Sequence, residues 1–390
     1  MITVDEALEH LFALVGPLDV EEVPLGDAAG RVLARQQTAR RDQPPFAASA
    51  MDGYAIRAAD LAPGARFDVV GDSAAGARFD GSISPGQAVR IFTGAPMPEG
   101  ADRVVIQEDC TREGAAMTIT GTPGDNRHVR AAGADFTIGH VMDAPRRLSP
   151  ADIALLAAMN VPRVPVTRRP EIALISTGDE LVMPGEAPGP DQIIASNTFG
   201  LKALAEEAGA HARLLPIARD SEESLITAFD LARGADLVVT IGGASVGDHD
   251  LVGKVAADLG MARSFYKVAM RPGKPLMAGR LEGSAMLGLP GNPVSAIVCG
   301  VLFLRPVIHA MLGLPPRAPA RLHATLEGSV PENGPRQHFM RAHVSEGRIT
   351  PFPTQDSALL SVLAQANALL PRPIGDGPRK PGERVEYIPI

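Results

Sequence analysis

The sequence predicts a multidomain protein of class α/β plus β, in which a central α/β domain with a mostly parallel sheet lies between β-rich regions. Three observations predict this fold. The chain has 390 residues, which is too long for a single hydrophobic core. Between Glu171 and Leu289, apolar runs of strand length alternate with helical patterns, as in parallel sheets with crossover helices. On both sides of this region, Gly and Pro separate short apolar runs at intervals of roughly ten residues, as in β structure.

Composition narrows the classes of function. The net charge is −8 and no basic tract occurs, which argues against nucleic acid as a partner. Cys110 and Cys299 are too far apart to give a zinc motif or a disulfide framework, so a reducing, cytoplasmic location is expected. No signal-peptide pattern begins the chain. Polar residues and a proline interrupt the longest apolar stretch, Val294 to Leu312, which predicts a buried helix and no membrane partner.

The N-terminal part begins with a predicted helix over Thr3–Val15, because Thr3 and Glu6 form a capping-box pattern before an apolar stripe. Residues Arg40–Ala55 have an irregular, Pro-marked pattern, and a loop of this length is more often functional than idle. Phe67–Ile119 shows short strands and turns. A helix is expected over Leu148–Asn160, with Ser149 as its cap.

The central region supplies the strands and helices of the α/β domain. Strands are expected at Glu171–Ser176, Ala212–Ile217, Asp236–Ile241, Ser264–Met270 and Ala285–Leu289. Helices are expected at Asn197–Ala208, at Ser221–Ala232, from Leu251 onward and after Pro293. Because parallel strands end at one edge of a sheet, three or four loops should open there, where such sheets bind ligands.

The last part of the chain follows a linker-like break at Leu314–Pro316. Short apolar runs with turns then continue to Ile390 and indicate a small β domain. Within it, Ser357–Ala366 has the pattern of a short helix.

The loop after the Asp236 strand is the most informative stretch, and it reads Thr-Ile-Gly-Gly-Ala-Ser-Val-Gly-Asp-His-Asp over 240–250. Its glycines, Gly242, Gly243 and Gly247, permit backbone angles and close approaches that a side chain would forbid. Asp248 and Asp250 stand where the next helix begins. They are either ligand-binding carboxylates or helix caps, and the loop alone leaves both open.

Charged residues recur in the neighbouring loops. The acidic loops are Thr177–Glu180, Arg219–Asp220 and Gly247–Asp250, and the basic one runs from Lys267 to Lys274. Carboxylates at the ends of neighbouring strands can hold Mg²⁺, and cations and backbone N–H groups can hold phosphate. Each residue alone is more often a cap or a solvated surface charge. Together, the loops favour a phosphate site with a divalent cation. The sequence contains neither a dinucleotide fingerprint nor a Walker A motif, and His249 stays unassigned.

Six motifs in order resemble those of the molybdopterin molybdenumtransferase family, the MoeA family that includes the gephyrin E domain. They span nearly the whole chain: Ser49-Ala-Met-Asp-Gly-Tyr-Ala55, Thr93-Gly-Ala-Pro-Met-Pro-Glu-Gly100, Ser176-Thr-Gly-Asp-Glu-Leu181, Gly242-Gly-Ala-Ser-Val-Gly247, Arg271-Pro-Gly-Lys-Pro275 and Leu289-Pro-Gly-Asn-Pro-Val-Ser295. Each motif is weak alone, and their order and spacing carry the resemblance.

The resemblance implies a homodimer of four-domain subunits. Domain I would comprise residues 1–38 and 137–169 and take part in dimerisation, and domain II would be the small β-rich domain over 39–136. Domain III would be the α/β domain over 170–314, similar to molybdopterin adenylyltransferases and binding molybdopterin. Domain IV would be a β barrel over 315–390.

The resemblance also implies a reaction. Adenylylated molybdopterin and molybdate would react with Mg²⁺ present, molybdenum would enter the dithiolene, and AMP would leave. The active site would lie between the α/β domain of one subunit and the small β domain of the other. Candidate protein partners are a molybdopterin adenylyltransferase and proteins that load molybdoenzymes.

The matching motifs carry the family's roles over to individual residues. The catalytic residues would be Asp52, Thr93, Glu180, Asp220 and Asp250, of which Glu180, Asp220 and Asp250 would hold the metal. The substrate-binding residues would be Arg130, Asp135, Gly242, Gly243, Ser245, Gly247, Lys267, Arg271, Lys274, Pro290, Pro293, Ser361 and Arg336 or Arg341. The C-terminal residues are carried over on the weakest match. At Arg271 a lysine is expected more often, and Asp250 matches the family carboxylate better than Asp248.

Two other functions compete with this interpretation. The first is molybdopterin adenylyltransferase, whose family usually shows Gly-Gly-Thr-Gly followed by Arg-Asp where this chain has Gly-Gly-Ala-Ser-Val-Gly. The second is a non-catalytic scaffold of the gephyrin type. Because the chain keeps Asp52, Glu180, Asp220 and Asp250, an enzyme is favoured over a scaffold.

Overall fold

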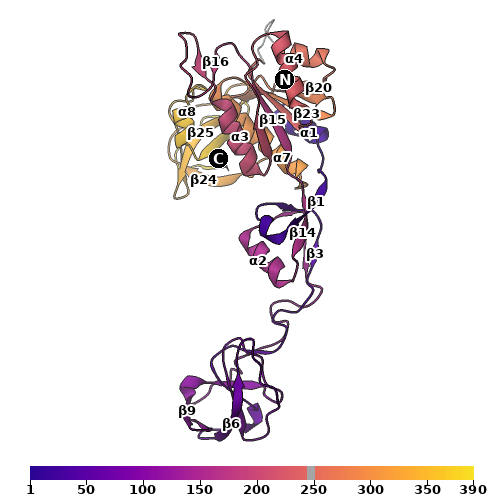
Figure 1. Ribbon diagram of the computed structural model, residues 1–390. Coiled ribbons are helices and arrows are strands. Elements are labelled where there is room, and N and C mark those ends of the chain that lie inside the picture. Colours follow the sequence, from indigo (N-terminus) through magenta and orange to yellow (C-terminus); the bar gives the residue numbers. More distant parts are fainter. Residues whose placement is uncertain (244–250) are drawn as a thin grey trace. The chain divides into compact units, whose positions relative to one another are not determined.

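A computed structural model describes residues 1–243 and 251–390. The chain divides into two compact units, each traced in Figure 1. Unit 1 comprises Met1–Glu21, Gly30–Ala34 and Val166–Ile390, and unit 2 comprises Glu22–Ala29 and Arg35–Pro165.

Unit 1 contains the predicted α/β domain, built on a six-stranded sheet with the order β18-β15-β19-β23-β22-β20. Its strands are β15 (Glu171–Ser176), β18 (His211–Leu214), β19 (Leu237–Ile241), β20 (Ala262–Tyr266), β22 (Met277–Leu281) and β23 (Ser284–Leu289). The first four strands in this order pair in parallel, and β22 and β20 add antiparallel pairings. The mostly parallel sheet is therefore confirmed.

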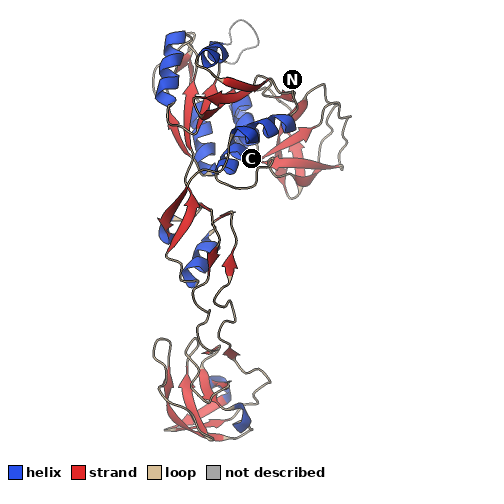
Figure 2. Cartoon of the chain, turned by 90° about the vertical axis from the view of Figure 1, so that its right-hand side faces the viewer, coloured by secondary structure: helices blue, strands red, loops and turns tan. Residues whose placement is uncertain are grey.

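Helices cover both faces of this sheet (Figure 2). They are α1 (Val4–Leu14), α3 (Asn197–Ala208), α4 (Glu222–Ala232), α5 (Leu251–Asp258), α6 (Pro293–Cys299) and α7 (Arg305–Met311), with the π-helical turn η4 (Gly300–Leu304) joining the last two. Successive side chains of β15 point to opposite faces of the sheet. Ile172 and Leu174 pack in the core with α1, α3 and α6, and Ala173 and Ile175 pack with α4 and α5. Each fully buried large aliphatic side chain stabilises the fold by roughly 1.5–3 kcal/mol.

The sequence pattern placed the starts of several helices correctly. Thr3 caps α1 in a capping box with Glu6, as predicted, and Ser221 caps α4. The helical stretch Pro293–Met311 is long and apolar enough to cross a membrane by length and composition. However, 83% of its most apolar window is buried inside the protein, as the interrupted pattern predicted.

The prediction of one strand over Ser264–Met270 is wrong. β20 ends at Tyr266, and the next residue, Lys267, has a φ of 71°, which an extended strand cannot contain. The chain then forms the two-residue strand β21 (Met270–Arg271), which leaves the α/β sheet and pairs with the C-terminal region. The sequence also gave no sign of β22, which follows this excursion.

The C-terminal region of unit 1 is a closed five-stranded barrel. Its strands are β24 (Leu322–Leu326), β25 (Gln337–Ser345), β26 (Arg348–Pro351), β27 (Ala368–Arg372) and β28 (Arg384–Pro389). They follow the order β25-β26-β24-β28-β27, and β27 pairs back onto β25 to close the barrel. The short helix α8 (Leu360–Gln365) falls inside the predicted Ser357–Ala366. Before α3, the short strands β16 (Leu181–Val182) and β17 (Ile193–Ile194) pair in parallel.

Unit 2 contains the predicted small β domain, a six-stranded sheet with the order β8-β5-β7-β6-β10-β9. Its strands are β5 (Gly53–Ile56), β6 (Arg66–Ser73), β7 (Gln87–Ile91), β8 (Arg103–Ile106), β9 (Cys110–Glu113) and β10 (Ala116–Ile119). The prediction that Arg40–Ala55 is wholly irregular is wrong at its end, because β5 is a buried strand between β7 and β8. Gly53 fits there because a Cβ would overlap the carbonyl of Val105.

The remaining elements are short, apart from α2 (Pro150–Ala158), which Ser149 caps in a capping box with Asp152. The short strands are β1 (Val20–Pro24), β2 (Val32–Leu33), β3 (Gln37–Thr38), β4 (Ala48–Ser49), β11 (Val129–Arg130), β12 (Val141–Met142), β13 (Arg146–Arg147) and β14 (Arg163–Thr167). The 3-10 turns are η1 (Leu25–Asp27), η2 (Ala58–Asp60) and η3 (Gln107–Asp109).

Candidate functional site

A cleft of about 910 Å³ opens at the carboxyl ends of β15, β19 and β23 in unit 1. Its walls include Ser176 to Gly178 after β15, Gly242 and Gly243 after β19, and Pro290 to Pro293 after β23. Strands with a common direction bring these loops to one edge, as the alternating sequence pattern predicted. The cleft therefore collects residues that lie more than one hundred positions apart in the sequence.

Two glycines shape the floor of this cleft. Gly242 has a φ of 93° and Gly243 a φ of 64°, both in the left-handed region that favours glycine. Gly242 donates its backbone N–H to the Leu289 carbonyl at 3.1 Å, and a Cβ at Gly242 would lie 2.7 Å from the carbonyl oxygen of Thr177. The turn therefore lets the backbones of β15, β19 and β23 meet at the cleft.

We expect Gly242→Ala to lower the free energy of unfolding by about 2–4 kcal/mol, because it combines left-handed strain with a backbone overlap. Gly234→Ala is the matched control, since Gly234 also has a positive φ of 81° but open space around its Cβ position. Urea denaturation followed by circular dichroism measures both. Equal losses for the two variants would show that the overlap at Gly242 relaxes at no cost.

Glu180 and Asp220 place two exposed carboxylates on the wall of the cleft. Arg219 joins their loops, because its Nη1 donates to the carbonyls of Asp179 at 3.0 Å and Leu181 at 3.2 Å. Within the described residues, neither carboxylate accepts a hydrogen bond or forms an ion pair. Asp220 is not the cap of α4 either. The cap is Ser221, whose hydroxyl accepts a hydrogen bond from the backbone N–H of Ser224.

These two carboxylates fit part of a Mg²⁺ site, because Mg²⁺ is usually bound by one or two carboxylates with water and phosphate oxygens. The residues that the structure describes contain no group of three His, Cys, Asp or Glu side chains suited to a metal. The third predicted ligand, Asp250, lies outside the described residues, as do Ser245 and Gly247.

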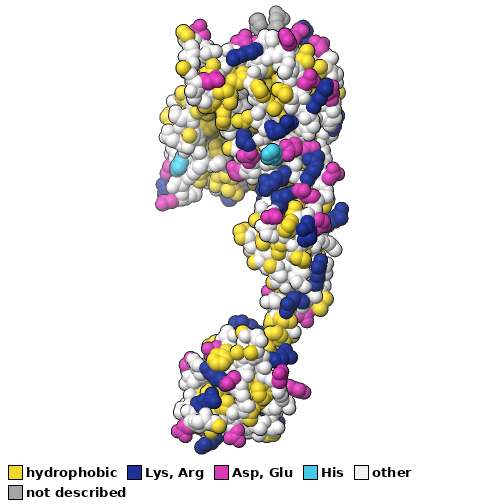
Figure 3. Space-filling view, in the orientation of Figure 1, with side chains coloured by type: hydrophobic (Ala, Val, Ile, Leu, Met, Phe, Trp, Pro, Cys, Tyr) yellow, Lys and Arg dark blue, Asp and Glu magenta, His cyan; other side chains and the backbone are white. Residues whose placement is uncertain are grey.

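The opposite wall of the cleft is less charged. Pro290 and Pro293 both line it, as predicted, and the side chain of Asn197 fixes the turn between them by donating to the Gly291 carbonyl at 2.7 Å. Ile193 and Ile194 also line the cleft, and their side chains are exposed by 58% and 39%. Hydrophobic side chains gather on the face of unit 1 that Figure 3 shows, so the cleft opens on an apolar surface. The sequence patterns gave no sign of Asn197 or of the two isoleucines.

The cationic residues that were predicted to bind substrate do not line the cleft. Of the described residues, those lining the cleft include Pro275 but none of Lys267, Arg271, Lys274, Arg336, Arg341 and Ser361. The ammonium of Lys267 lies 4.8 Å from the centroid of the Tyr266 ring, and Ser361 is exposed on α8. Arg271 is carried by β21 to β25, where it pairs in register with His338. Sequence patterns predicted a basic loop at the cleft, and the structure shows Arg271 joining the barrel.

Arg341 is the most unusual residue of this second group. It is fully buried, and only its Nη2 has a partner, the Asp356 carbonyl at 2.9 Å. Its Nε and Nη1 are buried without a partner among the described residues. Burial, and next the charge of Arg271, lower the pKa of the Arg341 guanidinium. A buried cation without a carboxylate partner is costly, so this position is suited to an anion from outside the chain.

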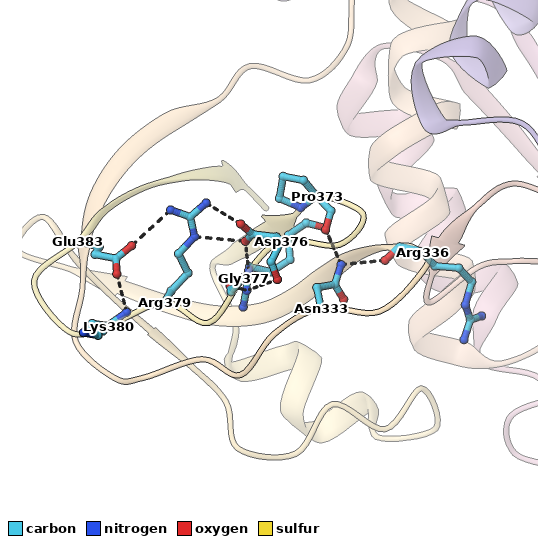
Figure 4. Close-up of polar contacts among 9 residues, drawn as sticks. Asn333, Arg336, Pro373, Asp376, Gly377, Arg379, Lys380 and Glu383 are labelled. Carbon is cyan, nitrogen blue, oxygen red and sulfur yellow. Dashed lines mark hydrogen bonds and ion pairs between the residues drawn. The ribbon is translucent and has the colours of Figure 1, made fainter.

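A third arginine, Arg372, is neutralised by its own network. Its guanidinium donates to Asp376 and to the Gly377 carbonyl at 2.6 Å, and Arg379 also contacts Asp376 (Figure 4). Asn333 holds the strand ends together through the carbonyls of Arg336 and Pro373. In Figure 4 the side chain of Arg336 points away from this network.

One short loop connects the arginines with the cleft. Ala358 lines the cleft, and two residues earlier the carbonyl of Asp356 accepts the hydrogen bond of Arg341. Between them, the carbonyl of Ser357 accepts the Val294 N–H at 3.0 Å, which ties the loop to α6. Residues 356–358 therefore connect Arg341 to the cleft. The sequence predicted Ser361 here, and it missed Ser357.

In unit 2, Asp52 and Thr93 form a local pair. The backbone N–H and the hydroxyl of Thr93 both donate to Oδ1 of Asp52 at 2.7 Å. These two hydrogen bonds, with a smaller effect of Arg90, lower the pKa of the Asp52 carboxyl. Arg90 also donates to the Gly53 carbonyl at 2.9 Å and lies over the Phe92 ring, so it supports the same turn. The family resemblance named Asp52 and Thr93 without predicting that they contact each other, and it did not name Arg90.

The other predicted residues of unit 2 lie along the same irregular segment. Arg130 pairs with Ala48 in the β11–β4 ladder, and the next residue, Ser49, bonds on its other side to Gly94 and Ala95. The N–H of Asp135 donates to the Gln43 carbonyl at 2.9 Å, farther along the segment. Both Arg130 and Asp135 are exposed.

Comparison with known families covers most of the chain. Residues 2–160 match the MoeA N-terminal region (domain I and II), residues 173–310 match a probable molybdopterin binding domain, and residues 323–390 match the MoeA C-terminal region (domain IV).

Individual relatives agree with these matches. The chain is 36% identical to a molybdopterin molybdenumtransferase of Nostoc sp., over 96% of this chain and 91% of the relative. It is 34% identical to the protein of that name from Bacillus subtilis, over 100% of this chain and 94% of the relative. Among solved structures, a molybdopterin biosynthesis MoeA protein from Pyrococcus horikosii has a TM-score of 0.85 at 30% identity, covering 100% of this chain and 99% of that one.

Proposed function

The chain belongs to the molybdopterin molybdenumtransferase family, and from this premise we propose that it inserts molybdenum from molybdate into adenylylated molybdopterin with Mg²⁺ present and releases AMP. Transfer of molybdenum in cofactor biosynthesis follows from the family. Beyond what the family shows, we propose that the substrate is adenylylated, that Mg²⁺ takes part and that the protein is cytoplasmic.

The observation that carries the proposal is a buried guanidinium beside a cleft with two exposed carboxylates, all of them without an ion-pair partner among the described residues. Arg341 offers Nε and Nη1 to an anion, and Arg271 adds a second cation at the exposed side. Guanidinium groups bind tetrahedral oxyanions through paired N–H donors. We therefore propose that molybdate binds to Arg271 and Arg341, and the burial of Arg341 supports it over the alternative, Arg336.

The cleft itself suits the larger substrate. The apolar surface of Ile193 and Ile194 and the turn Pro290–Pro293 are proposed to contact the pterin. Glu180 and Asp220 would hold Mg²⁺, which polarises a phosphoanhydride when bound. The backbone of Gly242 and Gly243 would approach the phosphate groups closely, because no side chain intervenes.

Asp52 and Thr93 are proposed to act in the same reaction. Because both Thr93 donors stabilise the carboxylate, Asp52 stays ionised at neutral pH and below. Its Oδ2 makes no hydrogen bond to another described residue, so it can accept one from substrate or water. Arg90 would hold this turn in place.

The experiment that tests the proposal supplies purified protein with adenylylated molybdopterin, molybdate and Mg²⁺. We expect molybdate-dependent AMP release and activation of a molybdenum-free molybdoenzyme, with no consumption of ATP. ATP-dependent adenylylation of molybdopterin would instead indicate the adenylyltransferase. Absence of both reactions would indicate the scaffold.

The variant Asp52→Ala should lower AMP release on the order of 10²-fold or more, because it removes an ionised group placed for the reaction. Its circular dichroism should match that of the unaltered protein, since Asp52 is only partly buried and Thr93 is exposed. Asp80→Ala, which removes an exposed carboxylate of the same unit, is the control. Equal activity of both variants would remove Asp52 from the site.

The remaining proposals concern assembly. We propose the four-domain division with boundaries near residues 38, 136, 169 and 314, and a homodimer as the assembly. Light scattering after size-exclusion chromatography measures the dimer directly. Pull-down with a molybdopterin adenylyltransferase tests the proposed protein partner.

A further inference from the structure

The side chain of Gln355 completes the backbone hydrogen bonding of β25 at the point where the neighbouring strand ends. β26 ends at Pro351, which lies opposite Ala342. The N–H of Phe352 still donates to the Arg341 carbonyl at 3.0 Å. Beyond it, Oε1 of Gln355 accepts the Arg341 N–H at 2.9 Å, and Nε2 of Gln355 donates to the Arg341 carbonyl at 2.9 Å. One amide side chain therefore bonds both backbone groups of the residue that carries the buried guanidinium.

The same loop also holds the guanidinium itself. Nε2 of Gln355 makes a second hydrogen bond, to the Phe352 carbonyl at 2.8 Å, which fixes the start of the loop. The next residue, Asp356, accepts the hydrogen bond from Nη2 of Arg341 on its carbonyl at 2.9 Å. Two consecutive loop residues therefore hold Arg341, because Gln355 bonds its backbone and Asp356 bonds its side chain.

The far end of this loop belongs to the cleft. Oδ1 of Asp356 accepts the N–H of Ala358 at 2.9 Å, and Ala358 lines the cleft. Between them, the Ser357 carbonyl accepts the N–H of Val294, which follows the cleft residue Pro293. The segment 355–358 is therefore bonded to Arg341 at one end and to the wall of the cleft at the other.

We propose that Gln355 is a positioning residue, which sets where the Arg341 guanidinium, and an oxyanion bound to it, lie relative to a substrate in the cleft. This inference rests on the proposed function, because the oxyanion is the molybdate of that reaction. Gln355 acts through Arg341 and takes no part in the reaction itself. A misplacement of about 1 Å can lower a rate by about 10²-fold, so a group that only fixes this geometry has a measurable effect.

A second amide side chain on the same strand provides a matched control. Oδ1 of Asn367 accepts the Val344 N–H at 2.7 Å, and Nδ2 donates to the Val344 carbonyl at 2.9 Å. This is the same pair of hydrogen bonds as at Arg341, made three residues farther along β25. Val344 carries no charge and is not among the described residues that line the cleft. A purely structural effect should therefore appear at both positions, and an effect on molybdate only at Gln355.

Steady-state AMP release, measured against molybdate and separately against adenylylated molybdopterin, tests the proposal. We expect Gln355→Met to raise the KM for molybdate on the order of tenfold and to leave the KM for adenylylated molybdopterin within about twofold. The second value should hold because Arg219 and Asn197 fix other loops of the cleft. Asn367→Leu should leave both KM values within about twofold, and thermal denaturation should show similar losses of stability for the two variants.

The outcomes separate this inference from the proposed function. An unchanged KM for molybdate in Gln355→Met, or an equal rise in Asn367→Leu, would make Gln355 a structural residue only and leave the proposed reaction standing. Failure of the unaltered protein to release AMP with molybdate would overturn both.

If Gln355→Met does not fold, amide hydrogen exchange in the unaltered protein decides, followed by nitrogen-15 spectra. An oxyanion on the guanidinium should hold Arg341 and its loop more firmly, so molybdate should slow the exchange of the Arg341 amide. The exchange of the Val344 amide should stay unchanged. An equal response of the two amides would overturn the role of Gln355.

Discussion

Arg341→Met is expected to make the unliganded protein more stable while it removes molybdate binding. Arg341 is fully buried, and two of its nitrogens have no partner among the described residues. Replacing such a group by an apolar side chain of similar length removes the cost of burying a charge. We expect the free energy of unfolding to rise by about 1–3 kcal/mol and AMP release to fall on the order of 10²-fold or more.

Denaturation with and without molybdate measures both effects. The unaltered protein should gain about 2.7 kcal/mol at a molybdate concentration one hundred times the dissociation constant, and the variant should gain nothing. Arg348→Met, which alters an exposed arginine of the barrel, is the control and should change stability by less than about 0.5 kcal/mol. If Arg341→Met proves strongly destabilising and still responds to molybdate, the guanidinium is a structural element and not an anion site.

Asp220→Asn is expected to abolish the Mg²⁺-dependent reaction with little change in stability. Asp220 is exposed at the cleft, and its carboxylate makes no hydrogen bond or ion pair with the other described residues, so the free energy of unfolding should stay within about 0.5 kcal/mol. The loss of a charged metal ligand should lower AMP release by roughly 10²–10³-fold and raise the Mg²⁺ concentration required.

A Mg²⁺ titration of AMP release distinguishes a metal ligand from a group that contacts substrate only. Asp230→Asn serves for comparison, because Asp230 is an exposed carboxylate on the helix that follows Asp220. An unchanged Mg²⁺ dependence in Asp220→Asn would place the cation elsewhere in the cleft.

The sequence alone predicted the structure correctly where that structure depends on residues close together in the chain. Thr3 with Glu6 formed the predicted capping box, and Ser149 caps α2 as predicted, in a capping box with Asp152 that was not predicted. The strand–helix alternation predicts a common direction for β15 and β18, so the convergence of Glu180 and Asp220 at one edge could be predicted without coordinates.

The rest depends on pairings between distant residues. In the sequence Arg271 belongs to a basic loop. Its position in the fold is set by the pairing of β21 with β25, which places Arg271 beside His338, 67 residues later in the chain. No periodicity reveals this register. The same limit explains why the choice between Arg336 and Arg341 stayed open, because the surroundings of Arg341 include Leu369 of β27 and the loop at Asp356, both distant in sequence.

The β21–β25 ladder also bears on how the oxyanion site is assembled. Val268 bridges Ile2 near the start of the chain, and Gln337 donates to the Ala269 carbonyl, so backbone hydrogen bonds hold this segment on two sides. Arg271 thus reaches its position during folding and not on encounter with the anion. A backbone that is fixed before the anion arrives loses no conformational freedom on binding, which favours affinity for a small, strongly hydrated ion.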